Sequence, residues 1–126
     1  MSVVAMNHFT VIARNLEETK VFYCELLNLK EGFRPKLGFP GAWLYVEDNP
    51  VLHIIAGRKR PTEITGVIDH MAFTGTNLPK FLKTLEKNNV KYTLKKQPET
   101  KIWQLFTVDP NGARVEIDFP ATENPK

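Results

Sequence analysis

The chain has 126 residues, of which 42% are hydrophobic and 25% are charged, and its formal net charge is +3. This length suffices for one domain or for two small modules that share a core, and the composition is that of a globular protein rather than a disordered one. The basic residues are spread along the sequence, and the densest run, Arg58 to Arg60, is only three residues long. We therefore expect no nucleic-acid partner.

The chain has one cysteine, Cys24, which cannot form an internal disulfide. This usage is typical of a reducing cytoplasm. Because no base lies near Cys24 in the sequence, we interpret it as a small packing residue rather than a nucleophile. No segment reaches the ~20 apolar residues of a membrane span, and the first residues do not resemble a secretory signal. These features predict a cytoplasmic protein with no membrane partner.

The first half of the chain reads as a strand, a helix and three more strands. An alternating segment begins at His8, and an amphipathic stretch follows from Leu16 to Leu29, with Asn15 as its N-terminal cap. Three strands are then predicted at 30–33, 42–46 and 51–56, with a turn at 47–50. The apolar loop segment 37–42 is open to two interpretations, a hinged lid or a rigid connection between strands.

The second half repeats this order. Asp69 and His70 open an alternating segment, and a helical pattern follows Asn77, with Pro79 in its first turn. Three strands are predicted at 92–94, 103–108 and 113–119. The turn Asp-Pro-Asn-Gly at 109–112 is typical of a tight hairpin, because Pro presets φ and Asn-Gly tolerates positive φ.

The repeat predicts an α+β fold made of two βαβββ modules in a single domain of residues 1–126. The first module covers 6–58 and the second covers 66–119. The polar segment 120–126, which contains two prolines, is expected to be a frayed tail.

Aligning the two modules places all three histidines at matching strand positions. His8 and His70 begin the first strand of each module, and His53 and Glu116 lie in the fourth strands, 45 and 46 residues later. Related by a pseudo-twofold axis, these four positions would converge. Three imidazoles and a carboxylate suit a divalent ion, Zn²⁺, Fe²⁺, Mn²⁺, Ni²⁺ or Co²⁺, and a cation would offset the cost of burying Glu116. The alternative is a set of core imidazoles, each with one hydrogen-bond partner.

Several stretches together resemble one protein family. They are Asn7-His8-Phe9, the helix start from Asn15 to Tyr23 with Leu27-Asn28-Leu29 after it, Asp69-His70-Met71-Ala72, and Phe106 to Gly112 leading into Val115-Glu116. The chain resembles the vicinal oxygen chelate superfamily, which groups glyoxalase I, fosfomycin-resistance, bleomycin-resistance, methylmalonyl-CoA epimerase and extradiol dioxygenase proteins. The resemblance covers about Met6 to Phe119 and implies a half-barrel-like sheet around a metal site.

The resemblance also implies which residues bind the metal: His8, His70 and Glu116. The fourth-strand position is Glu in glyoxalase I-like members and is His53 here, either as a ligand or as a residue behind the ligands. Such a metal would chelate a small oxygenated substrate and stabilise an oxyanion or enolate, with Glu116 as the candidate base. The implied activity is that of a lyase, isomerase or epimerase, in a protein that forms a homodimer.

Two other functions stay open at this stage. An extradiol-type Fe²⁺ dioxygenase usually keeps three protein ligands and needs a further histidine as base, and the chain has no fourth histidine. A metal-free, ligand-sequestering protein of the bleomycin-resistance type usually lacks the metal-ligand residues that this chain has.

Aromatic and basic residues near the strands are candidates for substrate contacts: Arg34, Trp43, Tyr45, Trp103 and Arg114. Trp43 and Tyr45 share one face of a strand, and Arg114 shares the face of Glu116 two residues away. Arg114 could therefore pair with Glu116, with Asp118 or with an anionic substrate. The aromatic residues are equally compatible with a core or dimer contact, and Arg34 with a solvated surface.

Overall fold

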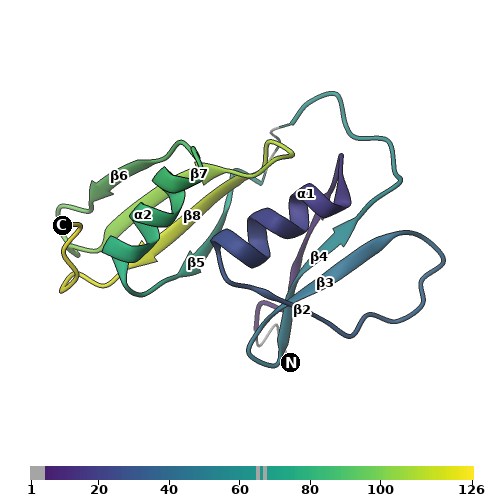
Figure 1. The fold of residues 1–126 in the computed structure, drawn as a ribbon, viewed down its shortest axis with the longest axis horizontal. Coiled ribbons are helices and arrows are strands. Elements are labelled where there is room, and N and C mark those ends of the chain that lie inside the picture. Colours follow the sequence, from purple (N-terminus) through teal and green to yellow (C-terminus); the bar gives the residue numbers. More distant parts are fainter. Residues whose placement is uncertain (1–4, 65, 67) are drawn as a thin grey trace. The chain divides into compact units, whose positions relative to one another are not determined.

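The computed structural model describes residues 5–64, 66 and 68–126, and the chain divides into two compact units, Met1–Thr62 and Glu63–Lys126. Each unit holds one helical segment and one four-stranded sheet (Figure 1). The protein is therefore α+β and is built of two βαβββ modules, as the sequence predicts. No helix among the described residues is long and apolar enough to span a membrane.

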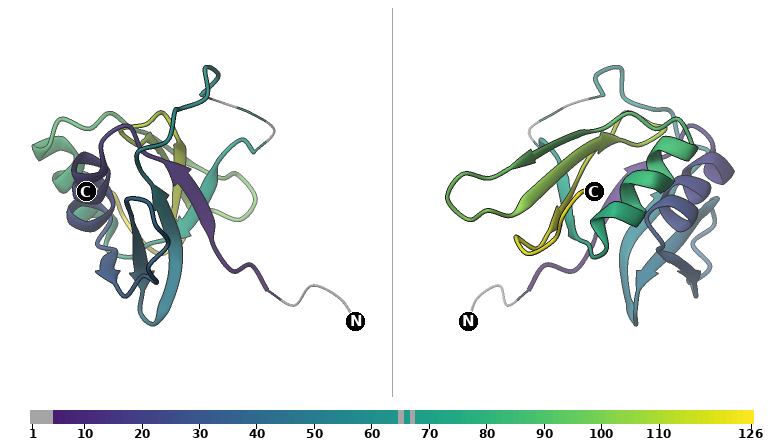
Figure 2. Two further views of the ribbon diagram at one scale, coloured as in Figure 1. Left: turned by 90° about the vertical axis from the view of Figure 1, so that its right-hand side faces the viewer. Right: turned by 60° about the vertical axis from the view of Figure 1, so that its left-hand side comes forward.

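The sheet of the first unit has the strand order β1-β4-β3-β2. Its strands are β1 (Phe9–Ile12), β2 (Lys30–Gly32), β3 (Gly41–Val46) and β4 (Asn49–Ile55). β1 runs parallel to β4, whereas β3 is antiparallel to both β4 and β2. β3 and β4, coloured blue to teal, run side by side in both views of Figure 2.

The turn between β3 and β4 is shorter than the predicted turn at 47–50. Asn49 already pairs with Val46, which leaves a two-residue connection. Glu47 takes a positive φ of 53° there. Two-residue hairpins need such backbone angles, and they usually contain Asn-Gly rather than Glu-Asp, so the sequence offered no signal for this turn.

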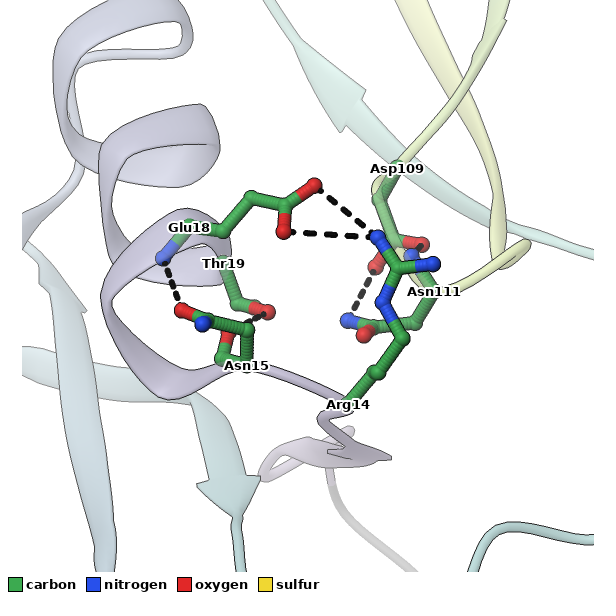
Figure 3. Close-up of polar contacts among 6 residues, drawn as sticks. All are labelled: Arg14, Asn15, Glu18, Thr19, Asp109 and Asn111. Atoms are coloured by element: carbon green, nitrogen blue, oxygen red, sulfur yellow. Dashed lines mark hydrogen bonds and ion pairs between the residues drawn. The ribbon is translucent and has the colours of Figure 1, made fainter.

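One helical segment covers one face of this sheet. α1 (Leu16–Lys20) begins at Asn15, whose side chain accepts a hydrogen bond from the Glu18 N–H at 2.9 Å, and Arg14 forms an ion pair with Glu18 at 3.2 Å (Figure 3). The segment then widens into a π-type helix, η1 (Val21–Leu26). It ends before the predicted Leu29, because Asn28 takes a left-handed φ of 65°.

The strands of the first unit alternate between two environments. Leu44, Leu52 and Ile54 are almost completely buried on the face that the helix covers. Trp43 and His53, which pair across β3 and β4, point to the other face and are only half-buried. We call this other face the open face of the unit.

The second unit repeats the topology, with the strand order β5-β8-β7-β6. Its elements are β5 (Met71–Thr74), α2 (Leu78–Lys87), β6 (Thr93–Lys96), β7 (Trp103–Val108) and β8 (Arg114–Phe119). β5 is parallel to β8, and β7 is antiparallel to its two neighbours. Buried residues again alternate along the strands, with Leu105, Val115 and Ile117 on the covered face.

The predicted hairpin turn at 109–112 is confirmed. The Asp109 carboxylate accepts hydrogen bonds from the backbone N–H groups of Asn111 and Ala113, both at 2.8 Å, and Figure 3 includes the Asp109 and Asn111 side chains. Gly112 has a φ of 92°, which explains the glycine at this position.

The segment after β8 is not the frayed tail that the sequence suggested. The Glu123 carboxylate accepts hydrogen bonds from the backbone N–H groups of Asn77 and Leu78, at 2.7 and 2.9 Å, at the start of α2. The indole N–H of Trp103 donates to the Glu123 carbonyl at 2.8 Å. A carboxylate at the positive end of a helix is favourable, so this residue anchors both the helix and the chain end.

Candidate metal-binding and catalytic site

Strand pairing places His53 and Glu116 at equivalent positions of the two units. His53 of β4 lies opposite Thr10 of β1, and Glu116 of β8 lies opposite Ala72 of β5. Thr10 and Ala72 each follow the first-strand histidine of their unit by two positions. Each open face therefore carries a histidine and, beside it, the fourth-strand side chain that the repeat predicts.

In the first unit, three aromatic rings form a stack on the open face. The His53 ring is stacked on His8 with ring centroids 3.7 Å apart and planes inclined by 16°, and on Trp43 at 3.9 Å and 8°. Because β4 lies between β1 and β3, His53 is the middle ring. Contact with a ring on each side limits rotation of the His53 imidazole.

The ring nitrogens of this stack are in distinct environments. Nδ1 of His8 lies 2.7 Å from the Asn7 side-chain oxygen, which accepts its proton and leaves Nε2 with a lone pair. His53 contacts the Pro50 carbonyl, and its own Nε2 is buried with no hydrogen-bond partner. A buried nitrogen without a partner costs about 1–3 kcal/mol. A metal ion is one group that would satisfy it.

Burial lowers the pKa of His53, and the neighbouring His8 and Arg34 lower it further, while the Pro50 carbonyl acts in the opposite direction. The reference pKa of histidine is 6.5, so His53 is neutral at pH 7. A metal ligand must be the neutral imidazole. The first unit therefore presents His53 in the protonation state that coordination requires.

In the second unit, His70 and Glu116 are paired directly. Nε2 of His70 lies 2.8 Å from Oε1 of Glu116, and Nδ1 of His70 lies 2.6 Å from a carboxylate oxygen of Asp69. Two neighbouring ligands of a six-coordinate ion, with bonds of about 2.1 Å, are about 3 Å apart. The spacing of these two atoms thus matches one edge of a metal coordination shell. Asp69 holds the other ring nitrogen, as the supporting carboxylate of a metal-bound histidine commonly does.

Glu116 is buried and belongs to a pair of carboxyl groups. Its hydrogen bond with Asp118 lowers the pKa of Glu116, and His70 and Gln104 lower it further. Burial and the negative charge of Glu116 raise the pKa of Asp118 to about 6. Oδ1 of Asp118 is buried without a partner, so the other oxygen faces Glu116. Two carboxyl groups this close favour a shared proton.

Arg114 forms its ion pair with Asp69, which is none of the three partners considered from the sequence. Its guanidinium lies 3.0 Å from the Asp69 carboxylate and packs 4.9 Å from the centroid of the Phe106 ring. The hydrogen bond from His70 is the main cause of the lowered pKa of Asp69, and Arg114 adds to it. Arg114 therefore supports the residue that orients His70, and it is paired with neither Glu116 nor Asp118.

The remaining substrate candidates are placed as follows. Trp43 lies on the open face of the first unit in the ring stack, whereas the Tyr45 hydroxyl donates to the Phe33 carbonyl at 2.7 Å. Arg34 donates to the Phe39 carbonyl at 3.0 Å and lies near His53. Tyr45 and Arg34 both bond to backbone carbonyls of the connection between β2 and β3. These bonds favour the rigid connection over the hinged lid for segment 37–42.

Trp103 lies on the wrong face for a contact with the Glu116 side chain. It pairs with Phe119, three residues along β8 from Glu116 and therefore on the covered face.

Burial raises the pKa of Cys24, so its thiol stays protonated, in agreement with its interpretation as a packing residue. No group of three or more His, Cys, Asp or Glu side chains that could hold a metal ion is present among the described residues.

Comparison with known proteins identifies the class. Residues 5–117 match the Glyoxalase/Bleomycin resistance protein/Dioxygenase superfamily, and the chain belongs to this superfamily. It is 27% identical to the Arabidopsis thaliana protein Glyoxylase I 4 over 125 residues, a match that covers 93% of this chain and 71% of the relative.

Solved structures share the fold. A glyoxylase/bleomycin resistance protein/dioxygenase domain from Frankia sp. EAN1pec has a TM-score of 0.77 at 19% identity, covering 98% of this chain and 96% of that one. A mutant of the fosfomycin resistance protein FosX from Listeria monocytogenes, complexed with Mn(II) and 1S,2S-dihydroxypropylphosphonic acid, has a TM-score of 0.76 at 12% identity and covers 94% of both chains.

Sequence reasoning missed the residues that support the candidate ligands, chiefly Asp69 and Gln104. A signal existed for the first: a polar residue precedes the first-strand histidine in both halves, Asn7 in one and Asp69 in the other. Gln104 carried no comparable signal. Its amide lies 3.5 Å from Oε2 of Glu116 because β7 and β8 pair in this register.

Proposed function

We propose that the chain is a metal-dependent enzyme of the lyase or isomerase type that acts on a small oxygenated substrate. The observation that supports this most strongly is the pair of ligand-type atoms in the second unit, Nε2 of His70 and Oε1 of Glu116, which are 2.8 Å apart. In the proposal, His8 and His53 complete the set, either within one chain or across a homodimer. The ion is Zn²⁺, Fe²⁺, Mn²⁺, Ni²⁺ or Co²⁺.

When bound, the cation would supply Lewis-acid stabilisation of negative charge on substrate oxygens. The protein's own part is to keep each imidazole ready to coordinate. Asn7 and Asp69 accept from Nδ1 of His8 and His70, which leaves Nε2 of each ring as the atom that would face a cation. Nε2 of His70 is paired with Oε1 of Glu116 in the metal-free chain, and metal binding would replace this hydrogen bond. The partnerless Nε2 of His53 fits the same role.

Glu116 is the proposed proton acceptor. Its pKa is lowered, so it is ionised at neutral pH and can accept a proton from a substrate carbon. Asp118, with a pKa of about 6, is the neighbouring group that can share that proton. Gln104 holds the second oxygen of Glu116 and limits its rotation. Trp43 and Arg34 are the proposed substrate contacts of the first unit.

Two relatives support the proposal. FosX is described with Mn(II) and a vicinal diol that carries a phosphonic acid, and the Arabidopsis relative is named as a glyoxylase I. These descriptions fit a divalent ion that is chelated by neighbouring substrate oxygens. The same proposal includes a homodimer, because members of the superfamily commonly form dimers. It also includes a cytoplasmic location, because the chain has a single cysteine.

The test is a metal titration of the chelator-treated protein by calorimetry. We expect about one Mn²⁺, Ni²⁺, Co²⁺ or Zn²⁺ per chain, lost in Glu116→Gln and kept in the matched control Glu99→Gln, an exposed glutamate of the same unit. Proton exchange next to the carbonyl of α-hydroxy ketones in D₂O, followed by NMR, should need both the metal and Glu116. Less than a tenth of an equivalent bound would refute the proposal.

A further inference from the structure

Arg34 occupies an unusual position in the first unit. It lies in the connection between β2 and β3, is half-buried, and rests against Gly41. A Cβ at Gly41 would lie 2.8 Å from Nη2 of Arg34 and would also collide with the Ile54 carbonyl oxygen. Only a glycine therefore leaves room for this guanidinium. Gly41 pairs with Ile55, two residues from His53 on β4, so the guanidinium lies beside the open face that carries the ring stack.

The hydrogen bonds of this guanidinium are incomplete. An arginine has five N–H donors. Nη2 of Arg34 donates to the Phe39 carbonyl at 3.0 Å, and the Phe39 ring packs 5.0 Å from Cζ. Nε is buried with no hydrogen-bond partner. Among the described residues, no carboxylate forms an ion pair with Arg34, in contrast to Arg14 and Arg114.

A buried donor on a charged group without an acceptor calls for one. An oxyanion fits, because the planar guanidinium matches a carboxylate or phosphate group through two parallel hydrogen bonds, here from Nε and one terminal nitrogen. An anion would add the direct attraction between opposite charges that the neutral Phe39 carbonyl lacks, so it would compete with Phe39 for Nη2.

We propose that Arg34, seated on Gly41, binds an oxyanion, and that this oxyanion is a carboxylate or phosphate-type group of the substrate. The anion site follows from the geometry alone, whereas its assignment to the substrate rests on the proposed function. The substrate is then a small molecule with one anionic end at Arg34, and its oxygenated carbon lies toward the ring stack of His53.

The test uses the full-length, metal-free chain and two probes, inorganic phosphate and acetate. The side-chain Nε–H resonances of the five arginines are followed by NMR, and the Arg34 resonance is assigned as the one absent from Arg34→Lys. We expect this resonance to shift saturably. By calorimetry, affinity should fall at least ten-fold in Arg34→Met, fall less in Arg34→Lys, and stay unchanged in the control Arg58→Met, an exposed arginine of the same unit.

Three results would overturn the proposal: an Arg34 resonance that does not move, a drift of all five resonances without saturation, or unchanged affinity in Arg34→Met. A metal titration of the same sample separates the two proposals. Anion binding without cation binding refutes the metal chemistry and leaves the Arg34 site intact, whereas cation binding without a response at Arg34 refutes only the anion site.

Discussion

Replacing Asp118 by asparagine should stabilise the metal-free protein at neutral pH. Asp118 faces the ionised Glu116 and keeps one buried oxygen without a partner. Its pKa is raised from 3.8 to about 6. At 1.36 kcal/mol for each pH unit, this difference corresponds to roughly 3 kcal/mol of destabilisation at pH 7. Because the side chain is partly exposed, solvent screening reduces the expected gain in Asp118→Asn to about 1–2 kcal/mol.

The sign of the pH dependence follows from the raised pKa. Between pH 3.8 and about 6, folded Asp118 binds a proton that the unfolded chain has already lost, so the stability of the natural protein decreases as the pH rises through this window. Asparagine cannot titrate. The gain in Asp118→Asn should therefore be near zero below pH 4, grow through this window, and stay constant above it.

Urea denaturation of both proteins at pH 4, 5, 6 and 7.5 measures this gain directly. A cation held by Glu116 and His70 would place a positive charge beside Asp118, so saturating Zn²⁺ should shrink the gain at pH 7.5. A gain that is equal at every pH, or a loss of stability at pH 7.5, would refute the electrostatic reasoning.

Three further predictions concern other parts of the two units. Asp69→Ala should weaken metal binding about 10–100-fold and Asp69→Asn much less, since asparagine keeps an acceptor; equal affinities by calorimetry would show that Asp69 does not orient His70. Glu123→Ala should lower the free energy of unfolding by about 1–3 kcal/mol, since two backbone N–H groups lose their acceptor; an unchanged urea midpoint would contradict the helix anchor. In the Trp103→Phe variant, the fluorescence of Trp43 should change when the stacked His53 is protonated. This change should have its midpoint below pH 6.5, because the pKa of His53 is lowered from that value. A fluorescence midpoint at or above pH 6.5 would refute this prediction.

The strands and the two-module repeat were predictable because they are local patterns. Alternation of buried and exposed residues defines β3, β4, β7 and β8. Similar spacings from the first-strand histidines, 45 and 46 residues, place His53 and Glu116 at equivalent positions. The sheet face on which Trp103 lies was also predictable from the sequence. A hairpin that pairs Trp103 with Phe119 puts it opposite to Glu116, since residues three apart on a strand point to different faces.

Contacts between distant segments could not be read from local patterns. Glu123 reaches the start of α2 from 46 residues away, and Arg114 reaches Asp69 from 45 residues away. The π-type turn of η1 has no propensity signal that separates it from an ordinary helix. Such features depend on where the folded chain brings a side chain, which the order of residues along one element does not reveal.

In the proposed metal site, the three histidines and Glu116 bind one cation. Long-range ¹H–¹⁵N NMR of the three imidazoles, assigned by single His→Gln variants, tests it directly. In the metal-free protein we expect His8 and His53 to carry the proton on Nδ1, where Asn7 and the Pro50 carbonyl accept it. One equivalent of Zn²⁺ should shift Nε2 of His8, His53 and His70 together. Shifts that are confined to one unit, or that reach completion at different Zn²⁺ ratios, would contradict the account.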